Sequence, residues 1–196
     1  MIFVLIVQGI IRTKRYKLGL FALVLTISLP ILAFWQVHSF RTQIQLSYHN
    51  IMEFRSGVVG DYSDTQRIVS YQMGLEATRN SPYFGVGMGD IRQEIQAVYQ
   101  KHYPNLSYKL PHNQFLYFYT GTGLIGMLAF VFCFFFPLFY KKHYQDPLFL
   151  GLYAIVFCSF MVEATIETAI GTAFYIFFVL LGLNFLSSGD KKSTMS

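Results

Sequence analysis

Long apolar runs alternate with short polar stretches along this chain of 196 residues. An α-helix needs about 20 mostly apolar residues to cross the hydrocarbon core of a bilayer, which is roughly 30 Å thick. We predict a spanning helix in each of four runs: residues 18–37, 114–140, 148–162 and 169–186. Residues 1–11 are apolar but too few to span, and we expect them to be the tail of a spanning helix whose beginning is missing.

Basic residues between the apolar runs predict the orientation of the chain. Lys and Arg are enriched in short cytoplasmic loops, whereas long external loops escape that rule. The basic loops 12–17 and 141–147 and the tail 187–196 are therefore predicted to be cytoplasmic. Residues 38–113 then form one large extracytoplasmic loop, and residues 163–168 form a short turn on the same side.

Composition supports an integral membrane protein. The chain is 54% hydrophobic, 18% aromatic and only 13% charged, which is rare in soluble domains. Its net charge of +5 comes from scattered residues, so we expect no nucleic-acid partner. A His-Glu-x-x-His motif and a cysteine ligand cluster are both missing, so we expect no metal site. The predicted fold class is an all-α polytopic membrane protein with about four spanning helices, a partial one and a large helical loop.

The large loop is predicted to contain three amphipathic helices, over residues 42–55, 65–80 and 91–103. We expect them to lie along the membrane surface or on other helices, and we expect Asp90 to cap the third. A glycine-rich stretch separates the last two helices: Gly85, Gly87 and Gly89. It does not fit a dinucleotide-binding loop, which needs a further glycine and a preceding strand. We expect a turn that brings its backbone close to another helix.

Candidate chemistry gathers where the polar loop meets the apolar run that begins at residue 114. His112 lies at this border, and histidine is mostly free to accept a proton at neutral pH. An isolated histidine is nevertheless more often a packing or surface residue than a catalyst. Arg67 could bind a phosphate or simply lie on a solvated helix face. Glu163 and Glu167 lie four residues apart, and pairing with an arginine of the loop is as good an interpretation as a catalytic role.

Two stretches resemble a known family. The first is Arg67, an aromatic residue four positions later at Tyr71, and then Pro-x-x-Gly-Val-Gly over residues 82–87. The second is His-Asn-x-x-Leu over residues 112–116, followed by Gly-Leu-x-Gly over residues 123–126. In order, spacing and membrane setting they resemble the O-antigen ligases and O-antigen polymerases, the bacterial envelope glycosyltransferases.

The resemblance implies a function at the periplasmic face of the bacterial inner membrane. Such enzymes transfer a glycan from undecaprenyl diphosphate to the lipid A core or to a second lipid-linked glycan, among membrane lipids and without a cofactor. It implies that His112 acts as base on the acceptor hydroxyl and that Arg67 steadies the diphosphate. Three further residues would support this site: Asn113, Tyr71 and Arg79.

Some features depart from the family pattern. Gly121 occupies a position where many members carry Glu. The predicted spans are fewer than members usually have, so we expect this chain to be the C-terminal half of such an enzyme, with a missing N-terminal half as partner. Ligase is the favoured function and polymerase its alternative. A truncated, non-catalytic membrane remnant is the alternative from another class.

Overall fold

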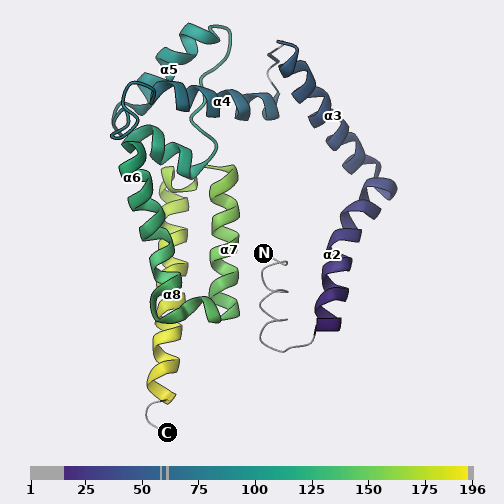
Figure 1. The fold of residues 1–196 in the computed structure, drawn as a ribbon, viewed down its shortest axis with the longest axis vertical. Helices are drawn as coiled ribbons and strands as arrows, with labels where there is room; N and C mark the ends of the chain where they lie inside the picture. The colour runs from purple at the N-terminus through teal and green to yellow at the C-terminus, as the bar shows by residue number, and fades with distance from the viewer. Residues whose placement is uncertain (1–15, 58, 61, 194–196) are drawn as a thin grey trace. The chain divides into compact units, whose positions relative to one another are not determined.

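The computed structural model describes residues 16–57, 59, 60 and 62–193 (Figure 1). Within this part of the chain every regular element is helical, which confirms the all-α prediction. The expected partial helix of residues 1–11 lies outside the described residues. The elements follow in the order α2 (Tyr16–Gln36), α3 (His38–Arg55), α4 (Ser63–Ala77), α5 (Ile91–His102), α6 (Gln114–Phe139), η1 (Tyr140–Gln145), α7 (Pro147–Val162), η2 (Thr165–Glu167) and α8 (Ala169–Ser193).

Two compact units divide between Val69 and Ser70, within α4. In the first unit, α2 and α3 meet at Val37 with a bend of 93°. Together these two helices are long and apolar enough to form one broken span or a re-entrant loop. Most large apolar side chains described in α2 are exposed, which suits a helix surrounded by lipid or by other membrane helices.

The second unit contains two helices that are long and apolar enough to span on their own. They cover Gln114–Gln145 and Ala169–Ser187. Between them α7 is apolar but has 16 residues, and at about 1.5 Å per residue it reaches roughly 24 Å. The four apolar runs are thus helical over nearly all their length, while their crossings of a membrane stay predictions.

Aromatic side chains hold α6, α7 and α8 together. Phe134 and Phe160 are almost fully buried, and their ring centroids lie 5.2 Å apart. Tyr153 of α7 lies 5.3 Å from Phe134, and Tyr175 of α8 lies 5.8 Å from Phe160. Since lipid is as apolar as these rings, close packing rather than hydrophobic transfer must hold such helices together. The cluster packs the later part of α6 against α7 and α8.

A loop inserts its backbone into α6 where that helix is interrupted. Gly123 has φ 68° and ψ −168°, a conformation open to glycine but not to most residues. The amide of Val86 donates to the carbonyl of Thr120 at 2.9 Å, and the amide of Leu124 donates to the carbonyl of Pro82 at 2.9 Å. The predicted close approach of the Gly85 turn to a helix is therefore confirmed.

The interruption changes the role we expected for the glycines of α6. From the sequence, Gly121, Gly123 and Gly126 at the start of this run predict close packing between spanning helices, because small residues let two backbones approach. Gly123 instead meets the backbone of the loop, because a Cβ built there would overlap the carbonyl carbon of Tyr83. Backbone groups freed by a break in a membrane helix need partners, and the loop supplies them.

Helix α5 packs through one face onto the rest of the second unit. Ile91, Ile95 and Tyr99 recur every four residues along it and are buried. Burial raises the pKa of Tyr99 to about 12, so its phenol is neutral at physiological pH. The predicted cap is wrong: Asp90 makes no side-chain capping bond. Its backbone is helical, with φ −99° and ψ −5°, whereas a capping side chain needs an extended backbone.

Candidate functional site

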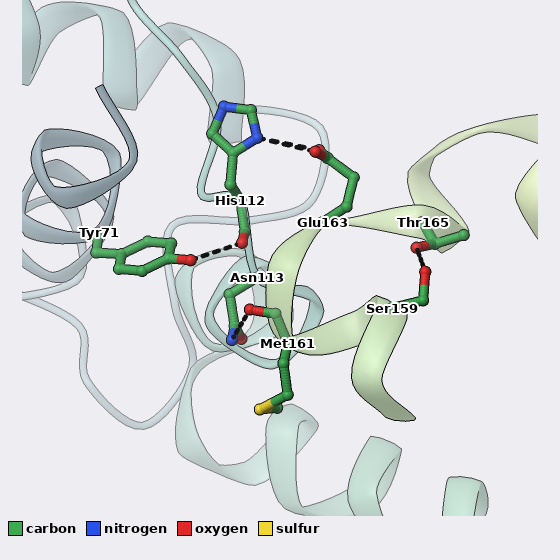
Figure 2. Close-up of polar contacts among 7 residues, drawn as sticks. All are labelled: Tyr71, His112, Asn113, Ser159, Met161, Glu163 and Thr165. Atoms are coloured by element: carbon green, nitrogen blue, oxygen red, sulfur yellow. Dashed lines mark hydrogen bonds and ion pairs between the residues drawn. The ribbon is translucent and has the colours of Figure 1, made fainter. Parts of the chain in front are cut away.

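His112 lies on a short, firmly held segment just before α6. Its carbonyl accepts a hydrogen bond of 2.8 Å from the hydroxyl of Tyr71 on α4 (Figure 2). The preceding Pro111 is fully buried, and a Cβ built on Gly74 would come within 2.8 Å of the Pro111 ring. Glycine at position 74 thus lets α4 lie directly against the segment. The hydrogen bond from Tyr71 and the packing of Pro111 against α4 fix the backbone of His112.

Tyr71→Phe should weaken this support without unfolding the protein. A hydrogen bond of this kind contributes about 0.5–1.5 kcal/mol, and its loss leaves the His112 carbonyl without that donor. We expect the free energy of unfolding, measured in detergent, to fall by that amount. Any activity that depends on His112 should fall less. Tyr108→Phe is the control, because Tyr108 is exposed in the preceding loop. Equal stability of the two variants would show that the Tyr71 contact contributes nothing.

Asn113 begins α6. Its backbone is extended, and its side-chain oxygen accepts a 3.0 Å hydrogen bond from the amide of Leu116, which is the usual geometry of an N-cap. Its side-chain nitrogen donates to the carbonyl of Met161 at 3.2 Å (Figure 2). Asn113 therefore ties the start of α6 to the end of α7 and positions its neighbour His112.

The imidazole of His112 faces a carboxylate from the turn after α7. Nδ1 lies 3.1 Å from each of the two carboxylate oxygens of Glu163 (Figure 2). Helix α7 ends at Val162, and Glu163 has an extended backbone with φ −153° and ψ 150°. The side chains are 26% and 55% exposed, so solvent and substrates can reach both. The sequence offered Glu163 as one of two candidate acids, and nothing in it pointed to a partner 51 residues away.

The turn that carries Glu163 is also fixed by Gln114. The side-chain oxygen of Gln114, which is fully buried, accepts a 2.7 Å hydrogen bond from the amide of Ile166. In the same turn Glu167 forms an ion pair with Arg92 of α5, and because the arginine side chain is 63% exposed this pair adds little to the hold on the turn. Pairing of a turn carboxylate with an arginine of the loop was one of the two interpretations left open, and for Glu167 it is confirmed.

The two predicted arginines are exposed, one on α4 and one just past its end. Arg67 is a residue of α4 and belongs to the first unit, whereas His112 and Glu163 belong to the second. Arg79 follows α4, and its guanidinium lies 3.5 Å from the carboxylate of Glu76. Among the described residues, no three His, Cys, Asp or Glu side chains are grouped so that they could hold a metal ion.

Helices, apolar surface and a titratable pair at the start of a long apolar helix define a polytopic membrane protein with a candidate site at a helix end. The family model for O-antigen ligase matches residues 1–131. The chain therefore belongs to the O-antigen ligase family, and this membership supports a membrane glycosyltransferase type of function. A search of curated proteins found no match. The matched residues include Arg67, Tyr71 and His112 but end before Glu163.

The structure gives a physical reason for the glycine at position 121. A Cβ built there would overlap the sulfur of Met88, and the Gly121 carbonyl accepts a 2.9 Å hydrogen bond from the amide of Gly87. A glutamate at this position would have to displace the inserted loop or the Met88 side chain. Gly121 therefore belongs to the docking of the loop and offers no acid to the site.

Proposed function

We propose that this chain transfers a glycan from undecaprenyl diphosphate to a hydroxyl acceptor, such as a sugar of the lipid A core, at the periplasmic face of the inner membrane. The observation that carries the proposal is the setting of His112. A histidine of the family motif stands on a backbone held by Tyr71 and Asn113, at the start of a membrane helix, with its ring partly exposed. A lipid-borne donor and a water-exposed acceptor can both approach such a position.

In the proposed reaction, the acceptor oxygen attacks the anomeric carbon of the glycan, and its proton moves to His112. The new glycosidic bond forms as the bond from that carbon to the diphosphate oxygen breaks. The electron pair of the broken bond remains on undecaprenyl diphosphate, which leaves with an added negative charge. A positioned general base contributes about 10²–10⁴-fold to such a step.

Arg67 is the proposed clamp for the diphosphate. It is exposed on α4, four residues before Tyr71, which is the spacing of the family motif. A guanidinium stays charged and binds phosphate oxygens in a bidentate way, and charge grows on the diphosphate as it leaves. The cation would therefore favour the transition state over the ground state.

Arg67→Ala should lower kcat/KM for the lipid-linked donor by roughly tenfold to a hundredfold, because a hydrogen bond to a charged group is worth about 1.5–3 kcal/mol. Arg67→Lys should recover part of the loss, since it keeps the charge but not the bidentate geometry. The matched control is Arg55→Ala, which removes an exposed arginine from the end of α3. Equal rates for the Arg67 and Arg55 variants would remove Arg67 from the site.

The function itself is tested in a host that lacks its own O-antigen ligase. Surface polysaccharide from cells with and without the chain is separated on a gel. Restored long glycans on the lipid A core support ligation. A second host displays only single repeats on the core. If the chain restores long glycans in that host, its activity is polymerisation. An unchanged gel in both hosts, with the chain present in the membrane, would contradict the proposal.

A further inference from the structure

We propose that Glu163 is the positioning residue for His112: its carboxylate holds the imidazole proton on Nδ1 and so keeps Nε2 free to accept the proton of the acceptor hydroxyl. This inference rests on the proposed function, in which His112 is the base. It adds a residue that lies outside the matched part of the family and beyond both motifs.

The hydrogen bond fixes which ring nitrogen carries the proton. Nδ1 of His112 lies 3.1 Å from both oxygens of Glu163. An ionised carboxylate can only accept hydrogen bonds, so Nδ1 must be the donor. A neutral imidazole has one N–H, and its second nitrogen then carries the lone pair. Nε2 is therefore the nitrogen that can take a proton.

Hydrogen bonds hold the segments that carry His112 and Glu163 in place. The amide of Glu163 donates to the carbonyl of Ser159 at 2.9 Å, which fixes the end of α7. Asn113, next to His112, donates to the carbonyl of Met161, two residues before Glu163. The Asn113–Met161 hydrogen bond therefore joins the segment of His112 directly to the segment of Glu163 (Figure 2).

The same carboxylate would act again after proton transfer. When Nε2 accepts the proton of the acceptor, the ring becomes an imidazolium with a positive charge. Glu163 then faces a charged hydrogen-bond donor instead of a neutral one, so the attraction between opposite charges adds to the hydrogen bond. Because the bond is stronger in the protonated state, it lowers the energy of the transition state more than that of the starting state.

A neighbouring carboxylate offers a matched comparison. Glu167 lies in the same turn, four residues on, but its partner is Arg92 and not the histidine. Glu163→Gln keeps the size of the side chain, and its new amide can donate to Nδ1, which favours the ring with its proton on Nε2. Glu163→Asp keeps the charge on a shorter side chain.

The kinetic test measures glycan transfer by the full chain in membranes. Glu163→Gln should lower kcat by at least about tenfold, within the range that a general base contributes, with little change in KM for the donor. Glu163→Asp should retain more activity than Glu163→Gln, and Glu167→Gln should stay near the native rate. If Glu163→Gln keeps the native kcat while His112→Ala is inactive, the positioning role is wrong and the proposed function stands.

A spectroscopic test does not depend on activity. The chain has five histidines, and ¹⁵N labelling of histidine allows the His112 ring to be assigned by its absence from the His112→Ala spectrum. At a pH where the ring is neutral, the native ring should carry its proton on Nδ1. Glu163→Gln should move the proton wholly or partly to Nε2, and Glu167→Gln should not. A native ring protonated on Nε2, or one unaffected by Glu163→Gln, would overturn the inference, whatever the outcome for the proposed function.

Discussion

His112→Ala should abolish glycan transfer while leaving the protein in the membrane. Loss of a general base costs about 10²–10⁴-fold, which is enough to remove long glycans from a polysaccharide gel. The fold should tolerate the change, because its contacts to Tyr71 and to the buried Pro111 segment run through the backbone of His112 and not through its ring. The measurement is the gel from cells carrying native or variant chain at equal membrane levels.

The control for this variant is His102→Ala, which removes an exposed histidine at the end of α5 in the same unit. The polysaccharide gel from cells with His102→Ala should match the gel from cells with the native chain. Long glycans made equally well by His112→Ala would mean that the histidine has no catalytic role. A variant lost from the membrane would instead assign His112 to the fold.

Gly85→Ala should destabilise the protein severely. Gly85 has φ +72°, a region that costs a residue with a side chain about 1–2 kcal/mol. A Cβ built there would also lie 2.5 Å from the amide nitrogen of Gly123 and 2.6 Å from that of Thr122. These are backbone atoms of α6 and cannot rotate away. We expect a loss of about 3 kcal/mol or more in the free energy of unfolding, because strain and a backbone clash act together.

Gly89→Ala provides the matched comparison, since it changes a glycine of the same stretch. A Cβ at Gly89 meets no atom within 4 Å. Its effect should stay within about 0.5 kcal/mol, as for ordinary surface substitutions. Thermal unfolding in detergent would compare both variants with the native chain. Similar stabilities would show that the loop does not insert into α6.

Several features of the fold could be predicted from the sequence because they follow from local rules. Apolar runs separated by basic loops predicted the helices of the membrane part. Gly85 could be assigned to a close backbone approach because a glycine lacks the Cβ that would prevent one. The helices of the loop were predicted within a few residues of their bounds, since prolines mark where helices stop, although the cap predicted at Asp90 does not form.

Other features could not be predicted because they depend on contacts between distant residues. The interruption at Gly123 is hidden in a run that reads as one apolar helix, and its partners lie about 40 residues earlier in the loop. The pairing of His112 with Glu163 joins the start of α6 to the end of α7. Asn113 and Tyr71 could be named from the family motif, but their bonds to Met161 and to the His112 carbonyl could not.

The proposed function requires this chain to move a glycan from a lipid diphosphate to a hydroxyl through His112. The most direct measurement uses purified chain in vesicles with a labelled glycan on undecaprenyl diphosphate and lipid A core as acceptor. We expect the label to appear on the acceptor with the native chain, with equal release of undecaprenyl diphosphate, and to stay on the donor with His112→Ala. Label that stays on the donor with the native chain, or that moves equally well with His112→Ala, would show that the chain does not transfer the glycan through His112.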